Sequence, residues 1–281
     1  IAVYWGWVPA LLWVTFGTIF FAGIHDMGAL WASTRNKGKS IGALSENVIG
    51  KRTRSLFLIV IFLLLLMVNA VFAVVISNGF VGTPGSVFPA WSAIVVALII
   101  GQLLRRNYSL LLLTAAGVVI LYISIWAGTF IELQLPETMF GLNANANWII
   151  ILFIYAAIAS MLPVWMLLQP RDFINGMQLI VGLILLYGAV FLSMPDMVAP
   201  AFNSQLAEGT PSIFPLLFVT IACGAISGFH GIVASGTSSK QLDKETDARF
   251  VGYLGAIGEG SLALITIVAV CSVAYAASPV Q

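Results

Sequence analysis

Charged residues are scarce in this chain. Only 8% of its 281 residues are Asp, Glu, Lys or Arg, against about 25% in a typical soluble domain. Hydrophobic residues make up 60%, so most of the surface cannot face water. This composition excludes an ordinary soluble domain and indicates a membrane protein that has the lipid bilayer, and no nucleic acid, as its partner.

Cysteine and histidine are also rare, with two of each. Cys223 and Cys271 both lie inside apolar runs, where a small buried hydrophobic residue is the expected role. A disulfide framework is therefore excluded, and no paired-histidine motif for zinc is present. We expect neither a metal site nor a cofactor.

The signatures of soluble enzymes are missing as well. Gly231 and Gly236 have the spacing of a phosphate loop, but Thr237 stands where that motif requires Lys, and an apolar helix precedes it in place of a strand. There is no G-x-S-x-G elbow. We do not expect an enzyme.

The beginning of the chain carries no targeting signal. The first residue is Ile1 rather than Met, and no basic region precedes the apolar residues 3–21. We therefore expect no signal peptide, and a chain that begins inside a longer protein.

Long apolar runs dominate the sequence. At about 1.5 Å per residue, a helix of about 20 residues crosses a hydrocarbon core of about 30 Å. Eight segments reach this length, and we place them at residues 7–32, 55–77, 88–104, 109–128, 148–168, 178–195, 213–235 and 251–275. The predicted fold is an all-α, polytopic membrane helix bundle that forms one transmembrane domain over residues 1–281.

The basic residues follow every second span, and the opposite loops hold none. They are Arg35, Lys37, Lys39, Lys51, Arg52, Arg54, Arg105, Arg106, Arg171, Lys240, Lys244 and Arg249. Because Lys and Arg accumulate in cytoplasmic loops, we expect these loops inside the cell and both ends of the chain outside. This topology corresponds to a multi-pass protein of the cell inner membrane.

One basic loop contains a helical pattern of its own. Ile41, Leu44 and Val48 recur at helical spacing after Ser40 and before Gly50. This predicts a short amphipathic helix that lies at the cytoplasmic interface.

Carboxylates inside the spans are candidate functional groups. Asp26 lies beside His25 near the inner end of the first span, and Glu259 lies about 12 Å into the last one. A carboxylate at such depth must face a cavity or a partner, or be protonated. Asp26, Glu259 and His25 are therefore candidate proton carriers, while a hydrogen-bonded structural role remains the alternative for each.

A glycine- and serine-rich stretch ends the seventh predicted span. Its candidate substrate-binding residues are Gly228, His230, Ser235, Gly236, Thr237, Ser238 and Ser239. The glycines lower helix propensity, and the hydroxyls can bond freed backbone or a solute. Irregular backbone at membrane depth is tolerated where it lines a cavity or is buried in protein. Tight helix packing through small residues explains the same pattern, and both readings stay open.

Prolines interrupt the fifth predicted span. Pro163 removes a backbone hydrogen bond in its middle, which predicts a kink, and residues 168–172 are expected to end it abruptly.

Several long motifs together resemble the carbon starvation protein A family. Early positions that match are Gly23, Asp26, Arg35, Gly38 and Ser40. The later motifs are Leu162-Pro163-Val164-Trp165, Leu168-Gln169-Pro170-Arg171-Asp172, Ser227-Gly228-Phe229-His230, Ser235-Gly236-Thr237-Ser238-Ser239-Lys240-Gln241-Leu242, Glu245-Thr246-Asp247-Ala248-Arg249-Phe250-Val251-Gly252-Tyr253 and Glu259-Gly260.

The resemblance implies a secondary active transporter for peptides or for a small carboxylate such as pyruvate, coupled to protons and used when carbon is scarce. It also implies broken helices in inverted repeats, a helix before Ile1 and further spans after the last residue, so that the domain is truncated at both ends. A membrane-embedded sensor or assembly subunit is the alternative function.

A transporter also needs a gate. We expect Arg171 to pair with Asp172, or with Glu245 and Asp247, and to latch an inward-facing gate rather than to meet substrate.

Overall fold

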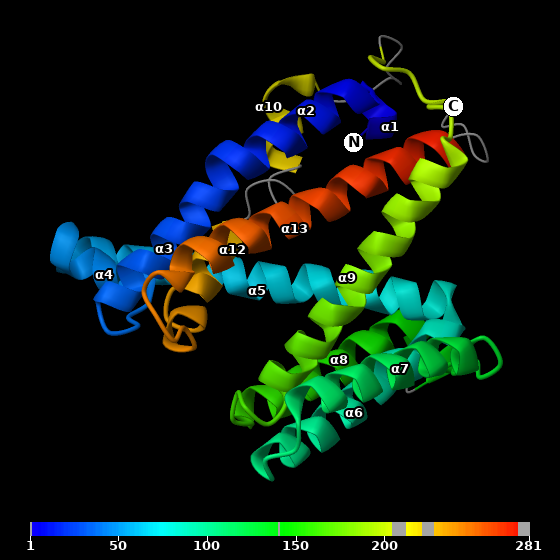
Figure 1. The fold of residues 1–281 in the computed structure, drawn as a ribbon, viewed down its shortest axis with the longest axis horizontal. Helices are drawn as coiled ribbons and strands as arrows, with labels where there is room; N and C mark the ends of the chain where they lie inside the picture. The colour runs from blue at the N-terminus through cyan, green and yellow to red at the C-terminus, as the bar shows by residue number, and fades with distance from the viewer. Residues whose placement is uncertain (1, 140, 204–211, 221–227, 275–281) are drawn as a thin grey trace. The chain divides into compact units, whose positions relative to one another are not determined.

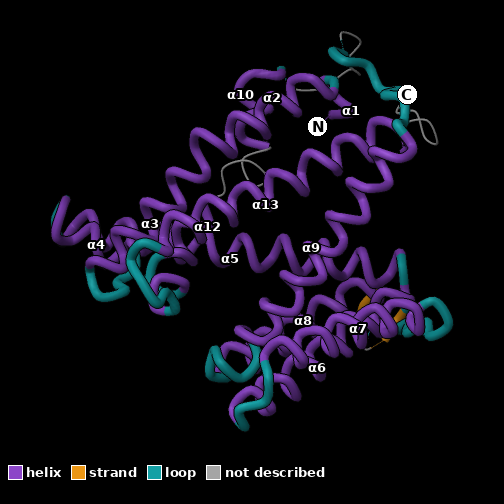
Figure 2. Tube along the Cα trace, viewed as in Figure 1, coloured by secondary structure: helices purple, strands orange, loops and turns teal. Residues whose placement is uncertain are grey.

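A computed structural model describes residues 2–139, 141–203, 212–220 and 228–274. The described chain is almost entirely helical (Figures 1 and 2). Its α-helices are α1 (Ala2–Trp5), α2 (Trp7–Gly17), α3 (Gly23–Arg35), α4 (Ile41–Val48), α5 (Lys51–Gly82), α6 (Val87–Arg105), α7 (Leu110–Gly128), α8 (Ala144–Met161), α9 (Leu168–Ser193), α10 (Ile213–Thr220), α12 (Gly228–Ala234) and α13 (Asp247–Ala269). The shorter elements are the π-helices η1 (Thr18–Ala22) and η4 (Val270–Ala274), the 3-10 helices η2 (Pro84–Ser86) and η3 (Ser238–Lys240), and the antiparallel strands β1 (Thr138–Met139) and β2 (Leu142–Asn143).

Seven helices in the described parts of the chain are long and apolar enough to cross a membrane. They correspond to seven of the eight predicted spans, which confirms the polytopic helical fold. The remaining predicted span, residues 213–235, includes α10 and α12, and its middle lies outside the described residues together with Cys223.

The chain divides into two compact units, and the first contains residues 1–62 and 183–281. Its centre is the contact of α3 with α13, which run side by side in Figure 1. Glycines bring these helices close, because a Cβ atom at Gly252 would lie 2.6 Å from the backbone nitrogen of Met27. Cys271 is fully buried in the same unit, as predicted, beside Ala10 and Val14.

The second unit contains residues 63–182. Its α6 and α7 pack closely as neighbours along the chain, and at one end Gly85 and Gly128 allow the two backbones to approach. The core of this contact is Val96, Ile100, Leu113, Leu121 and Ile174.

The boundary between the fifth and sixth spans differs from the prediction. Helix α8 ends at Met161, so Pro163 lies beyond the helix rather than at a kink in it. The residue before a proline favours extended backbone, and Leu162 has ψ 145°. Residues 168–172 begin α9 rather than end a helix, because Pro170 falls in the first turn, where its missing N–H is not needed.

The predicted amphipathic helix is confirmed as α4. The Ser40 side chain caps it by accepting a hydrogen bond from the backbone N–H of Ala43. Gly50 follows it with φ +114°, a backbone conformation that favours glycine.

Candidate proton-relay site

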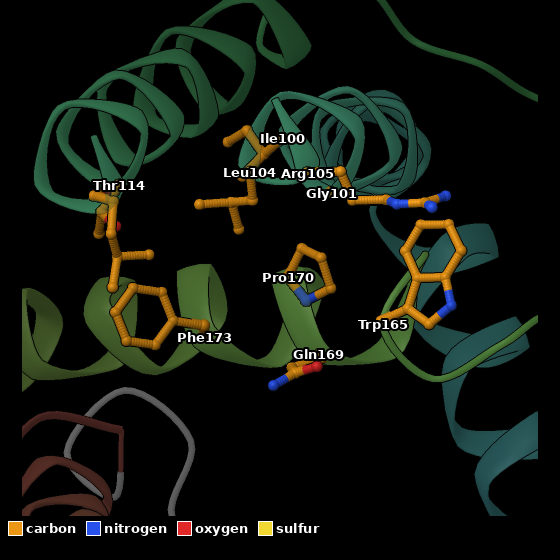
Figure 3. Close-up of a pocket in the computed structure, with 10 residues that line it drawn as sticks. Ile100, Gly101, Leu104, Arg105, Thr114, Trp165, Gln169, Pro170 and Phe173 are labelled. Atoms are coloured by element: carbon orange, nitrogen blue, oxygen red, sulfur yellow. The ribbon is translucent and has the colours of Figure 1, made fainter. Parts of the chain in front are cut away.

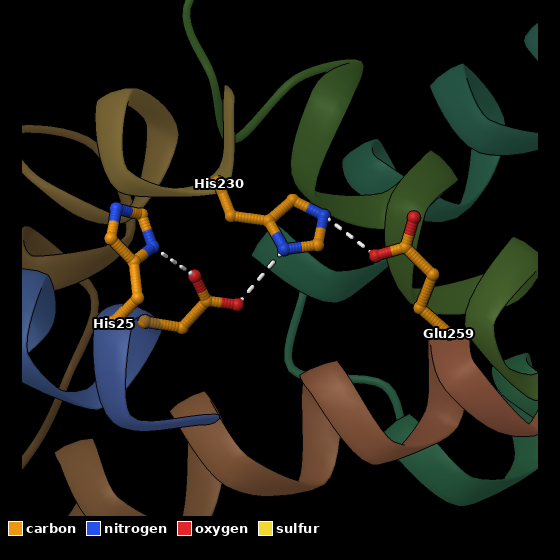
Figure 4. A network of polar contacts seen from close by, with 4 residues as sticks. His25, His230 and Glu259 are labelled. Atoms are coloured by element: carbon orange, nitrogen blue, oxygen red, sulfur yellow. Dashed lines mark hydrogen bonds and ion pairs between the residues drawn. The ribbon is translucent and has the colours of Figure 1, made fainter. Parts of the chain in front are cut away.

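His230 joins two carboxylates in the first unit. Its Nδ1 lies 2.9 Å from Oδ2 of Asp26, and its Nε2 lies 2.8 Å from Oε2 of Glu259. Nδ1 of His25 lies 2.9 Å from the other oxygen of Asp26. Figure 4 shows the resulting chain of contacts from His25 to Glu259. Three of the predicted polar residues and His230 therefore form one network.

Three different helices supply these side chains. Asp26 and His25 come from α3, His230 from α12 and Glu259 from α13. Gly231 lets the His25 ring approach α12, since a Cβ atom there would lie 2.7 Å from Cε1 of His25. The close contacts between the helices thus fix the spacing of the network.

The two contacts of His230 determine how many protons the network holds. Each needs one hydrogen atom between nitrogen and oxygen. Either His230 is doubly protonated between two carboxylates, or it is neutral and one carboxyl group carries the second proton. Moving that proton between His230 and Glu259 keeps both hydrogen bonds, whereas removing it breaks one. The site can therefore hold, transfer and release a proton.

Asp26 is the least exposed member of the network. Its side chain is 9% exposed, while the side chains of His25, His230 and Glu259 are 39%, 30% and 34% exposed. A pocket of about 240 Å³ lies beside His230 and Glu259, and its wall also includes Ser238. Both ends of the network, His25 and Glu259, are thus accessible, Glu259 from the pocket, while Asp26 between them is largely buried.

A cluster of buried hydroxyls lies near the C-terminal end of α3. Ser33 Oγ donates to the carbonyl of Lys39 at 2.7 Å and accepts from the backbone N–H of Gly236 at 3.1 Å. Since its single hydrogen is used, Ser239 must donate in the 2.7 Å contact between the two serine oxygens. Ser235 Oγ accepts from the N–H of Ile41. We call Ser33, Ser235 and Ser239 the serine cluster.

The predicted substrate-binding residues therefore separate into groups. His230 and Ser238 line the pocket with Asp26 and Glu259. Ser235 and Ser239 are buried and bonded to protein, and so is the backbone of Gly236. Gly228 and Thr237 are exposed and do not line this pocket.

Two of the charged residues expected at a gate, Glu245 and Asp247, have partners within the first unit. Glu245 accepts a hydrogen bond from Nε of Arg35 at 2.6 Å. Asp247 begins α13 and accepts from the backbone N–H of Lys244.

Arg171 donates from Nη1 to the Tyr155 hydroxyl at 3.1 Å. The structure gives no ion pair between Arg171 and the adjacent, exposed Asp172.

Two larger pockets lie in the second unit. The first, of about 510 Å³, lies between α6, α7 and α9 (Figure 3). At its edge the guanidinium of Arg105 lies 4.4 Å from the centre of the Trp165 ring. The other pocket, of about 420 Å³, contains Arg171 and Tyr155.

The sequence analysis missed Ser33, Arg35 and Tyr155 as contributors. A signal existed for Ser33, because Asp26, Leu30 and Ser33 follow the i, i+4, i+7 pattern of one helix face and all three are buried. No such local pattern identifies Tyr155, whose partner Arg171 is on the next helix. Among the described residues, no group of three or more His, Cys, Asp or Glu side chains is arranged to hold a metal ion.

Comparisons with known proteins identify the family of this chain and several relatives. The family model described as "Carbon starvation protein CstA" matches residues 1–279. "Peptide transporter CstA" of Campylobacter jejuni is 34% identical over 96% of this chain and 40% of its own length. "Pyruvate/proton symporter BtsT" of Escherichia coli K12 is 34% identical over 96% of this chain and 38% of its own length. The chain thus spans about two fifths of the length of these relatives. No solved structure matches it.

Proposed function

Because the chain belongs to the carbon starvation protein CstA family, we propose that it takes part in proton-coupled uptake of peptides or a small carboxylate such as pyruvate across the cell inner membrane. The printed names of its relatives support this proposal, since they include peptide transporters and a pyruvate/proton symporter. The basic loops face the cytoplasm in this proposal.

The bridging position of His230 between Asp26 and Glu259 carries the proposal. A symporter must bind a proton from one side and release it on the other. Glu259 and His230 can exchange one proton along their short contact, and Glu259 is the more exposed of the two carboxylates and lines the pocket. Asp26 is largely buried and holds the imidazole in position through Nδ1. We therefore assign the loading and release of the proton to Glu259.

Glu259→Gln tests this role. Gln imitates a protonated carboxyl group in shape and can still bond to His230, but it cannot release a proton. We expect the variant to insert into membranes and to lose accumulation driven by a pH gradient. Exchange of labelled solute at equal concentration on both sides should persist at least in part. The measurement is uptake and counterflow of labelled pyruvate and dipeptides in proteoliposomes.

Glu137→Gln is the matched control, since Glu137 is an exposed glutamate in a loop. It should accumulate solute like the wild type. Accumulation by Glu259→Gln at the wild-type level would remove Glu259 from the coupling mechanism. A sensor or assembly subunit would transport neither pyruvate nor dipeptides. The absence of uptake by the wild type and by every variant would therefore reject the transport function.

A further inference from the structure

The pocket around Arg171 combines an apolar wall with a single cationic side chain. It lies within the second unit and has a volume of about 420 Å³. Its wall includes the aromatic residues Phe72, Phe80, Trp91, Phe153 and Tyr155, and Arg171 is the one charged residue that lines it. Trp91 and Tyr155 meet edge to face, with ring centres 5.6 Å apart.

Among the described residues, Arg171 is one of the arginines that form no ion pair, and it is the one that lines this pocket. Arg35 pairs with Glu245, and Arg54 pairs with Glu46. Within the second unit, no described carboxylate lies within 4.0 Å of the Arg171 guanidinium, and the adjacent Asp172 interacts with it only at longer range. Its only hydrogen bond there goes to Tyr155, and its Nε is buried without any partner. Such a group is costly to leave unpaired.

A ligand with a carboxylate group would supply the partner that the Arg171 guanidinium lacks. Guanidinium groups bind carboxylates through paired N–H···O bonds, and the bond to Tyr155 leaves other N–H groups on the terminal nitrogens of Arg171 for such a partner. The aromatic wall would contact an apolar body attached to that carboxylate. The pocket beside Glu259 is a poorer site for an anion, because it is lined by Asp26 and Glu259.

We propose that the Arg171 pocket binds the C-terminal carboxylate of a short peptide whose last residue is apolar or aromatic. The proposal rests on the transport function above and names its substrate class. A volume of about 420 Å³ is typical of small-molecule sites, about 300–1,000 Å³. Pyruvate has only three carbon atoms and would leave the aromatic wall largely uncovered.

Binding of Ala-Phe and of its C-terminal amide to the protein in nanodiscs tests the proposal. Calorimetry should give at least tenfold weaker binding for the amide, which lacks the carboxylate charge. Arg171→Gln should lower the affinity for Ala-Phe to that for the amide and leave the affinity for the amide unchanged. Arg171→Lys keeps the charge without the paired N–H groups, so an intermediate affinity is expected, and it serves as the test if Arg171→Gln does not fold.

Arg105→Gln is the matched control, because Arg105 also lies against an aromatic ring in this unit but lines the other pocket. It should bind Ala-Phe like the wild type. Equal binding of acid and amide, or equal losses in the Arg105 and Arg171 variants, would overturn the proposal. Pyruvate binding that depends on Arg171 while Ala-Phe binding does not would overturn the peptide assignment.

The same titrations separate this proposal from the coupling mechanism. Glu137→Gln, in an exposed loop, should bind Ala-Phe with wild-type affinity. If Arg171 controls binding but Glu259→Gln still accumulates solute, the coupling role fails and the carboxylate site stands. If Glu259→Gln loses accumulation and the Arg171 variants bind normally, only the carboxylate site fails.

Discussion

Single polar residues have large effects in a chain this apolar, because each buried donor or acceptor needs a partner inside the protein. Ser33 is 0% exposed and makes three hydrogen bonds, to Lys39, Gly236 and Ser239. These bonds connect the end of α3 with the segment that follows α12. The serine cluster therefore stabilises the first unit.

Ser33→Ala should lower the stability of the protein. The carbonyl of Lys39 and the hydroxyl of Ser239 lose a partner, at a cost of about 1–3 kcal/mol for a buried polar group left unsatisfied. Thermal unfolding in detergent measures the effect. Ser55→Ala is the control, because Ser55 is exposed and bonds only within its own helix. Equal unfolding temperatures for the two variants would contradict a structural role for the serine cluster.

At the scale of elements, α13 packs through a stripe of small residues. Ala248, Gly252, Ala256 and Gly260 follow one another at intervals of four and are all buried. Small residues at this spacing let membrane helices approach closely. This stripe places Glu259 on a helix that is held tightly against α3 and η1, although the side chain itself points toward His230.

Gly252→Ala should separate α13 from α3. The added methyl group would lie 2.6 Å from the nitrogen and 2.7 Å from the Cα of Met27, and backbone atoms cannot turn away as a side chain can. Overpacking of this kind costs about 1–3 kcal/mol, so we expect a lower unfolding temperature.

Gly258→Ala on the same helix provides the comparison. A Cβ atom there meets no atom within 4 Å, and Ala favours helix over Gly by up to about 1 kcal/mol. Its unfolding temperature should stay the same or rise. A loss of stability in Gly258→Ala as large as that in Gly252→Ala would contradict close packing at Gly252 as the cause of the loss.

At the scale of the whole molecule, the charge distribution predicts orientation in the membrane. Single cysteines at Glu132 and Lys244, in a chain whose Cys223 and Cys271 are replaced by Ser, should react differently with an impermeant thiol reagent applied to intact cells. The Glu132 position should be labelled because its loop is expected outside, and the Lys244 position should be labelled only after the membrane is opened. The reverse pattern would overturn the orientation.

The sequence by itself determined the class of protein and most of its spans. A run of apolar residues predicts a membrane helix because its length alone matches the hydrocarbon core. Helix α4 was predictable for a similar reason, since Ser40 and Gly50 act on their immediate neighbours. Asp26 and Glu259 stood out individually because a carboxylate within an apolar span is costly.

Only the tertiary structure decided which groups meet. Asp26 and His230 are 204 residues apart in the chain, and no local pattern predicts that a histidine from α12 lies between carboxylates from α3 and α13. Arg35 pairs with Glu245, and the serines at 235 and 239 bond to Ile41 and Ser33. These partners depend on the close packing of separate helices, because hydrogen bonds and ion pairs act over a few ångströms in space and not along the chain.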